Sequence, residues 1–311
     1  MSGPVLALAG GVGGAKLAWG LAQVLPPEKL VIVVNTGDDA TFNGLHVSPD
    51  LDTVMYTLAG MANPETGWGI AGDTAHVLEM LARYGAPTWF RLGDRDMALH
   101  IRRTELLGQG LTLSQVTQQI CQRLGVQHQV VPMSDGTVRT LVATDEGEMP
   151  MQVYFVQRRC EPQVRSITFA GAEKAKASPG FDAALDEAGA LVFCPSNPYL
   201  SIDPILAIPG VRQRIASFRG PRVVVSPIVA GQALKGPLAK MMAELSEEST
   251  CVTIGRHYVG LCDLLLIDEA DRSSAADIER LGLRVETAPI VMSGPEHKVR
   301  LAQRIREMVG A

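Results

Sequence analysis

Short apolar runs alternate with segments of helical periodicity along most of the chain. The runs are rich in Val, Ile and Leu, a composition typical of strands that are buried on both faces of a parallel sheet. Because a loop of Gly, Pro, Ser, Asn or Asp residues follows each run, the pattern predicts consecutive βα units. The clearest strands are expected at Val5–Ala9, Leu30–Asn35, Ala190–Cys194, Arg222–Ser226 and Leu264–Asp268.

Helices are expected between these strands, because apolar residues recur three and four positions apart and several segments begin with Asp or Pro. Together with the strands they predict an α/β fold with a doubly wound, mostly parallel Rossmann-like sheet. Ligands of such sheets bind outside the carboxyl ends of the strands, so we expect the functional site in the loops that follow them. The predicted helices are Ala15–Leu25, Asp73–Tyr84, Asp94–Leu107, Leu113–Leu124, Asp203–Ser217, Pro237–Leu245 and Pro295–Val309.

The pattern changes between about residue 111 and residue 170. Apolar and polar residues alternate there in three segments with Asp-Gly and Glu-Gly turns, which predicts antiparallel strands. We therefore expect residues 111–170 to form an inserted α+β subdomain, and residues 1–110 and 171–311 to form the Rossmann-like core. The antiparallel strands are predicted at Val138–Thr144, Pro150–Val156 and Val164–Phe169.

Composition narrows the class of protein. A chain of 311 residues can bury a large core without covalent cross-links, and its five scattered cysteines, without CxxC spacing, favour reduced thiols and a cytoplasmic protein. No basic region precedes the first apolar run, which predicts a strand rather than a signal peptide, and no run is long enough to span a membrane. The net charge of −5 argues against a nucleic-acid-binding surface and favours a small-molecule partner.

A glycine-rich turn, GGVGGAK at residues 10–16, follows the first predicted strand. Glycines let the backbone approach an anion closely, and the helix that follows directs free N–H groups and its positive dipole end toward that anion. The turn departs from the Rossmann fingerprint at Lys16 and lacks the Ser or Thr of a Walker A loop. The alternative is a tight turn with a solvated lysine. We expect phosphate contacts from Gly11, Gly13, Gly14 and Lys16.

Four carboxylates lie close together in the segments NTGDD (35–39) and SPDLDT (48–53). One acid near the second strand would suffice for a ribose hydroxyl, whereas several acids beside a phosphate loop favour a Mg²⁺ site. We predict that Asp38, Asp50 and Asp52 are metal ligands and catalytic residues. As alternatives, Asp50 or Asp52 caps the next helix and Asp39 stabilises a turn, and we expect at least one of the four to be structural.

Three further loops carry candidate binding residues. Arg91, Asp94 and Arg95 follow a predicted strand at Pro87–Phe90; the arginines suit phosphates or carboxylates, with a salt bridge to an acid as the alternative, and helix capping alone could explain Asp94. The segments PSNP (195–198) and SPI (226–228) offer uncharged hydrogen-bonding groups that suit a base, a ribose or a phosphate, with rigid turns as the alternative. From these segments we select Ser196, Asn197 and Ser226.

These motifs, with GWG (67–69) and LGDRD (92–96), closely resemble the 2-phospho-L-lactate transferase family of coenzyme F-420 biosynthesis over essentially the whole chain. The resemblance implies a cytoplasmic, Mg²⁺-dependent homodimer. It also implies transfer of a phosphorylated three-carbon acid from a guanylyl diphosphate donor to the ribitol hydroxyl of the deazaflavin Fo, with release of GMP. The acid could be 2-phospholactate or its phosphoenolpyruvate or 3-phosphoglycerate equivalent.

The resemblance also implies individual roles. Asp50 would meet the ribityl end of Fo or its metal, and Arg91 stands where archaeal members carry a basic deazaflavin contact, usually Lys. The glycine-rich turn would face the donor phosphates, and the loops of Ser196 and Ser226 the nucleotide. Trp68 would border the deazaflavin ring, unless it is an ordinary core tryptophan.

Two other functions compete with this one. A nucleotide-sugar-binding regulator, like the YvcK-like gluconeogenesis factors, would share the fold and the glycine-rich start but would not turn over. A nicotinamide-dependent dehydrogenase is favoured only by the glycine-rich turn, and Lys16 at the last glycine position weakens that interpretation.

Overall fold

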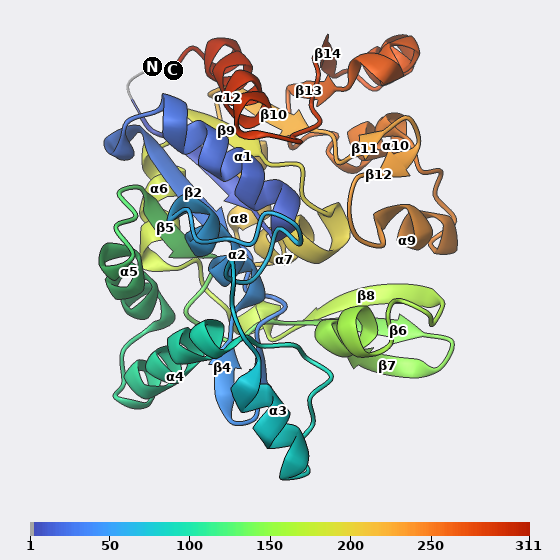
Figure 1. Ribbon diagram of the computed structural model, residues 1–311. Coiled ribbons are helices and arrows are strands. Elements are labelled where there is room, and N and C mark those ends of the chain that lie inside the picture. Colours follow the sequence, from blue (N-terminus) through green and yellow to red (C-terminus); the bar gives the residue numbers. More distant parts are fainter. Residues whose placement is uncertain (1–2) are drawn as a thin grey trace.

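The computed structural model describes residues 3–311 and has a seven-stranded sheet at its centre (Figure 1). Its strand order is β14-β13-β10-β9-β1-β2-β5, and all neighbouring strands run parallel. The five strands expected from their apolar runs are therefore confirmed. The seven strands are β1 (Val5–Ala9), β2 (Leu30–Val34), β5 (Gln129–Pro132), β9 (Ala190–Phe193), β10 (Arg222–Val225), β13 (Leu264–Ile267) and β14 (Arg284–Thr287).

Both faces of the sheet are covered, which explains why its strands are continuously apolar. In β1, the side chains of Val5, Ala7 and Ala9 pack into one core cluster, and those of Leu6 and Leu8 pack into the other. The doubly wound α/β fold predicted from the sequence is thus confirmed. One cluster lies under α1 (Gly11–Val24), α2 (Pro49–Leu58), α5 (Leu113–Arg123) and α12 (Pro295–Val309), and the other under α6 (Pro179–Glu187), α7 (Asp203–Leu206), α8 (Val211–Ala216), α9 (Leu238–Glu244), α10 (Cys251–His257) and α11 (Ala275–Glu279).

The strand order reverses direction beside β1. From β1 the chain proceeds to β2 and β5 on one side, and it later continues through β9, β10, β13 and β14 on the other. At such a switch point the loops after the two central strands diverge and leave a crevice. The glycine-rich turn after β1 and the PSNP loop after β9 flank this crevice.

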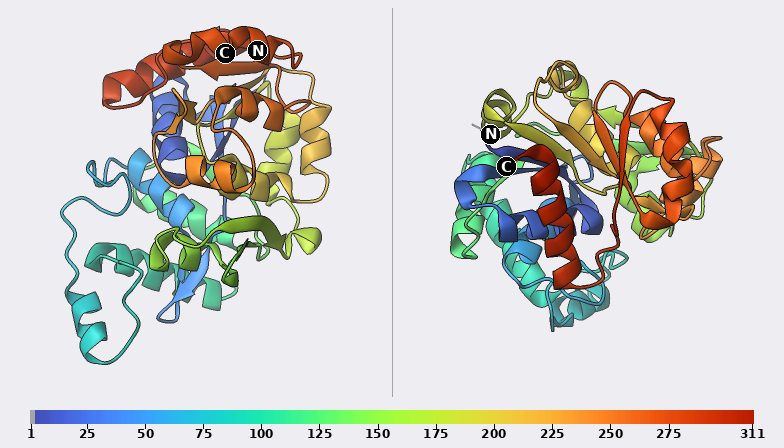
Figure 2. Two further views of the ribbon diagram at one scale, coloured as in Figure 1. Left: turned by 90° about the vertical axis from the view of Figure 1, so that its right-hand side faces the viewer. Right: turned by 90° about the horizontal axis from the view of Figure 1, so that it is seen from above.

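Smaller elements follow the strands of the central sheet: the β11–β12 hairpin lies beside α9 and α10, and the others lie beyond the carboxyl ends of β1 and β2 (Figures 1 and 2). They include a three-stranded antiparallel sheet in the order β7-β6-β8 and two short hairpins. None of the helices within residues 3–311 is long and apolar enough to cross a lipid bilayer. The smaller elements are β3 (Ala40–Phe42), β4 (Leu45–Val47), α3 (His76–Arg83), α4 (Asp94–Gly108), β6 (Arg139–Thr144), β7 (Gly147–Pro150), β8 (Val164–Ala170), β11 (Ile228–Val229) and β12 (Gln232–Ala233).

The region expected to be an insertion divides differently from the prediction. Strand β5, within residues 111–170, pairs with β2 in the central sheet, so the separate sheet occupies only residues 139–170. The strand predicted at Pro150–Val156 is wrong: β7 ends at Pro150 and a helical turn follows. That turn places Met151 and Tyr154, three positions apart, on one buried face, which an alternating strand could not do.

Three other expected boundaries differ. No strand forms at Pro87–Phe90, which is irregular, and α3 starts at His76 rather than Asp73. The helix predicted over Asp203–Ser217 is interrupted, because Pro209 cannot continue it and Gly210 adopts a left-handed φ of 83°.

Helix α1 begins at Gly11, so the glycines form its first turn instead of a loop before it. A Cβ on Gly13 would overlap the carbonyl oxygen of Pro195, and one on Gly14 would lie 2.7 Å from Oγ of Ser196. Glycine is therefore required where α1 passes the loop after β9.

Gly13→Ala is expected to destabilise the protein by about 1–3 kcal/mol, because a backbone carbonyl must move to admit the methyl group. Gly108→Ala, where no atom lies within 4 Å of the added Cβ, serves as the control and should not destabilise. Urea unfolding measures both variants, and equal stabilities would contradict the close approach of α1 to the loop.

Candidate functional site

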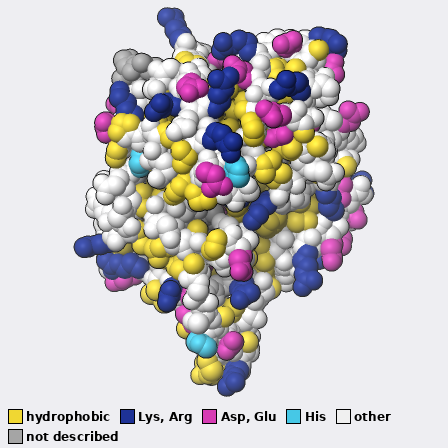
Figure 3. Space-filling view, turned by 45° about the horizontal axis from the view of Figure 1, so that its top comes forward, with side chains coloured by type: hydrophobic (Ala, Val, Ile, Leu, Met, Phe, Trp, Pro, Cys, Tyr) yellow, Lys and Arg dark blue, Asp and Glu magenta, His cyan; other side chains and the backbone are white. Residues whose placement is uncertain are grey.

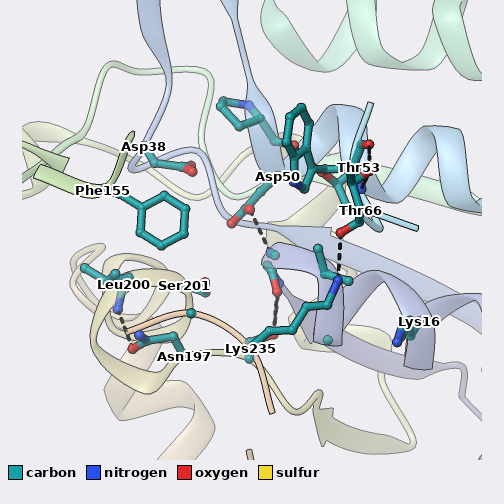
Figure 4. A pocket seen from close by; sticks show the side chains of 18 of the residues that line it. Lys16, Asp38, Asp50, Thr53, Thr66, Phe155, Asn197, Leu200, Ser201 and Lys235 are labelled. Atoms are coloured by element: carbon teal, nitrogen blue, oxygen red, sulfur yellow. Dashed lines mark hydrogen bonds between the residues drawn. The ribbon is translucent and has the colours of Figure 1, made fainter. Parts of the chain in front are cut away.

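A cavity of about 830 Å³ lies at the carboxyl ends of the central strands, a size typical of small-molecule sites. Loops after β1, β2, β9, β10 and β14 line it, together with residues between α2 and α4. Four of the five loops in which we expected the site therefore contribute to it, and the loop after β13 does not. Figure 4 shows Asp38 and Asp50 near each other, with Lys235 across the cavity.

Two backbone contacts shape the glycine-rich turn. The hydroxyl of Ser196 accepts a hydrogen bond from the Gly10 N–H (3.1 Å) and donates one to the Gly10 carbonyl oxygen (2.8 Å). The Gly11 N–H donates to Oδ1 of Asp50 at 2.7 Å. The first turn of α1, whose N–H groups have no partner within the helix, thus lines the cavity beside a carboxylate.

The side-chain amide of Asn35 joins two of the predicted metal ligands. Its Nδ2 donates to Oδ1 of Asp38 (3.2 Å) and to Oδ2 of Asp50 (3.0 Å). Burial raises the pKa of Asp50 to about 6, despite the hydrogen bonds from Asn35 and Gly11. Burial, followed by the charges of Asp50 and Asp39, raises the pKa of Asp38 well above its usual range. A cation would relieve both the desolvation and the repulsion of this carboxylate pair.

The third predicted ligand, Asp52, has another partner. Both of its carboxylate oxygens pair with the guanidinium of Arg103, which is 1% exposed. Oxygens of Asp52 and Asp96 and a ring nitrogen of His100 lie within 4.8 Å of one another and could in principle hold a metal ion. Because Arg103 already neutralises Asp52, the geometry favours a structural role for Asp52 in holding α2 against α4.

Of the three residues selected around LGDRD, only Arg91 lines the cavity. The Asp94 carboxylate accepts hydrogen bonds from the hydroxyl of Thr74 and from the N–H groups of His76 and Val77, and so caps α3. Hydrogen bonds from Thr74 and these N–H groups lower the pKa of Asp94. The side chain of Arg95 is exposed and does not line the cavity. The structure therefore does not bring Asp94 and Arg95 to the site.

Ser226 and Asn197 line the cavity, but their side chains also stabilise turns. The Ser226 hydroxyl donates to the carbonyl oxygen of Ile228 at 2.8 Å. Oδ1 of Asn197 accepts hydrogen bonds from the N–H groups of Tyr199 and Leu200 at 3.0 and 3.2 Å. These contacts match the rigid turns that the prolines indicated.

Two lysines line the cavity. The ammonium group of Lys16 donates to the carbonyl oxygen of Met292 at 2.9 Å, and its pKa is lowered by burial and by the charges of Lys235 and Lys298. Lys235 donates to the carbonyl oxygen of Thr66 at 2.7 Å. Sequence reasoning missed Lys235, because the chain around it, LKGP, carries no strand or motif signal.

Aromatic side chains form an apolar wall. Trp68, 46% exposed, lines the cavity with Phe90 and Phe155, so it is not an ordinary core residue. Phe155 was missed because its segment had been predicted to be a strand. On the face drawn in Figure 3, hydrophobic side chains are interspersed with charged side chains of both signs.

Comparison with known proteins identifies the chain. The model of the family described as 2-phospho-L-lactate transferase CofD matches residues 5–291. The protein belongs to the CofD family. Its relatives include proteins named phosphoenolpyruvate transferase from Streptomyces griseus (43% identical, covering 98% of this chain and 98% of the relative) and Thermobifida fusca (40% identical, covering 96% and 95%).

Membership of the CofD family makes this protein a transferase and removes the dehydrogenase alternative. A protein of the UPF0052 family from Bacillus halodurans has a similar structure, with a TM-score of 0.63 over 98% of this chain and 99% of that one. At 15% identity, this likeness shows a shared fold and nothing about activity.

Arg103→Met is expected to destabilise the CofD-family fold by about 3–5 kcal/mol, because it leaves the Asp52 carboxylate buried without its partner. Adding Asp52→Asn should recover part of that loss. Denaturant unfolding of both single variants and the double variant measures the coupling energy, and strictly additive changes would contradict the pairing.

Proposed function

We propose that this protein transfers the phosphoenolpyruvate group of a guanylyl diphosphate donor to the ribitol hydroxyl of Fo and releases GMP, a step of coenzyme F-420 biosynthesis. The observation that carries the proposal is the Asp38 and Asp50 pair, which the Asn35 amide holds beside the first turn of α1 in the large cavity. Phosphoryl transfer depends on such positioning and electrostatic stabilisation, with little covalent work by the protein.

The donor diphosphate is assigned to the glycine-rich turn. The Gly11 N–H is used by Asp50, so an anion is favoured by the N–H group of Gly13 and by the positive end of the α1 dipole. The ammonium groups of Lys16 and Lys235 add positive charge to the same cavity. The loops of Asn197 and Ser226 extend the cavity from that turn and offer room for the nucleoside.

Mg²⁺ is assigned to Asp38 and Asp50. Their oxygens are hard ligands, and although each already accepts one hydrogen bond, a carboxylate oxygen can accept a second interaction. Burial raises the pKa of both carboxyl groups, and the charge of Asp50 raises that of Asp38 further, which also fits a cation-binding pair. When bound, the ion would neutralise charge on the donor phosphates.

Fo is assigned to the part of the cavity lined by aromatic residues. The flat faces of Trp68 and Phe155 suit a fused ring system, and the exposed guanidinium of Arg91 can hydrogen-bond its carbonyl groups. The ribityl chain would then extend toward Asp50.

The choice of phosphoenolpyruvate as the transferred three-carbon acid is based on the names of the relatives. Those named above are phosphoenolpyruvate transferases, whereas the family model carries the name of 2-phospho-L-lactate transferase. Purified protein should therefore be incubated with Fo, Mg²⁺ and each guanylyl donor in turn: phosphoenolpyruvate, 2-phospholactate and 3-phosphoglycerate.

Mass spectrometry of the products tests activity and donor together. We expect GMP and the phosphoenolpyruvyl adduct of Fo, formed faster than the other two adducts. A higher kcat/KM with another donor would contradict the choice of acid. No adduct with any donor, despite binding of Fo, would contradict the proposed function.

Stabilisation by Mg²⁺ should depend on pH. Asp50 has a pKa of about 6 in the folded protein, so it is ionised at pH 8 and protonated at pH 5. We expect MgCl₂ to raise the melting temperature more at pH 8 than at pH 5, relative to KCl of equal ionic strength.

Asp50→Asn should reduce this Mg²⁺ effect at pH 8. Without metal the sign is opposite: because folding raises the pKa of Asp50, its protonation favours the folded state as the pH falls through 6. A Mg²⁺ effect that is equal at both pH values, or unchanged in the variant, would remove Asp50 from the metal site.

A further inference from the structure

A fourth carboxylate, Asp96, lines the cavity from the first turn of α4. Its side chain is 13% exposed. The Tyr56 hydroxyl donates a hydrogen bond to Oδ1 at 2.7 Å, and Nε2 of His100 lies 3.2 Å from the same oxygen. Both neighbours therefore contact the same oxygen of Asp96, and of the two only Tyr56 has the geometry of a hydrogen bond.

The guanidinium of Arg103 fixes the orientation of the imidazole proton on His100. Nη1 of Arg103 lies 3.4 Å from Nδ1 of His100, and a guanidinium only donates. Nδ1 is therefore the acceptor, and the proton is on Nε2, which faces Asp96. The carboxylate thus receives a hydrogen bond from Tyr56 of α2, and the ring N–H of His100 on α4 lies beside it.

The second oxygen of Asp96 is different from every other carboxylate oxygen in the cavity. Asp38 accepts hydrogen bonds on both oxygens, from Asn35 and Gln152, and so does Asp50, from Gly11 and Asn35. Asp52 pairs through both oxygens with Arg103. Oδ2 of Asp96 has no hydrogen-bond partner among residues 3–311 and is not sealed from solvent.

Charges around Asp96 favour its ionised form. Burial alone would raise its pKa, but the adjacent His100 ring, the hydrogen bond from Tyr56 and the charge of Arg103 together lower it below the usual range. The ionisable groups that face it are Tyr56 and Asp52 from α2, His100 and Arg103 from α4, and Asp73, whose carboxylate accepts from the Asp96 N–H.

We propose that Asp96 is a catalytic residue, whose Oδ2 accepts the proton of the attacking ribitol hydroxyl. This inference rests on the proposed function. The electron pair of the O–H bond forms the new O–P bond, and the proton passes to Oδ2. The bond between that phosphorus and the oxygen of GMP breaks, and its electron pair stays on GMP. Asp38 and Asp50 then serve the cation, and proton transfer falls to a carboxylate with a free oxygen.

Asp96→Asn separates this role from a structural one. The amide keeps Oδ1 as the acceptor for Tyr56 and as the neighbour of His100, and replaces only Oδ2, so a merely structural residue would tolerate it. We expect kcat to fall about 100-fold or more, while the affinities for Fo, by fluorescence titration, and for Mg²⁺ stay within about threefold. Glu105→Gln, the same change at an exposed position of α4, is the matched control and should leave kcat unchanged.

Two outcomes would overturn the proposal. A kcat for Asp96→Asn equal to that of the wild type would leave the residue structural. A rate restored by more Fo or Mg²⁺ would make it a binding group. Both are measured against a wild-type enzyme that forms the adduct, so they leave the proposed function standing, which fails only if the wild type forms none.

Discussion

The fold brings its site together through one amide. Nδ2 of Asn35 donates to Asp38, to Asp50 and to the carbonyl oxygen of Leu200, and thereby joins segments that follow three different elements. Since every one of these groups is buried, loss of the amide would remove one hydrogen bond from each carboxylate and leave Asp38 only its contact with Gln152 and Asp50 only its contact with Gly11. The position of Asp50, and through it that of the Gly11 N–H, depends on this contact. A neutral side chain thus organises the charged ones.

Local patterns were sufficient to predict the sheet and the place of the site. Buried parallel strands are apolar on both faces, so their runs are visible in the sequence, and ligands gather where those runs end. The glycine-rich turn and Asp38 and Asp50 were found this way, because motif and strand end coincide. The partners that these residues contact in the folded protein could not be predicted in this way. Arg103 lies 51 positions from Asp52, and no local signal connects a buried arginine with one acid of four.

The two acids of the LGDRD motif also show that local sequence patterns do not reveal tertiary contacts. Asp94 carries the motif, but only folding reveals that its carboxylate is used by the N–H groups of α3. Asp96, two positions later, was not selected from the sequence, yet it lines the cavity from the first turn of α4. Side chains two positions apart on a helix point in different directions, so Asp94 and Asp96 face different surroundings although they are close in the sequence.

The caps of α3 and α4 are exchanged between the two helices. Asp94, in the first turn of α4, caps α3, while Asp73, just before α3, accepts the N–H groups of Arg95 and Asp96. These reciprocal hydrogen bonds hold the two ends of the segment 73–94 next to each other. A rigid shift of α3 would therefore displace the first turn of α4. Because Asp96 in that turn lines the cavity, a movement of α3 at the periphery of the protein is transmitted to the cavity wall.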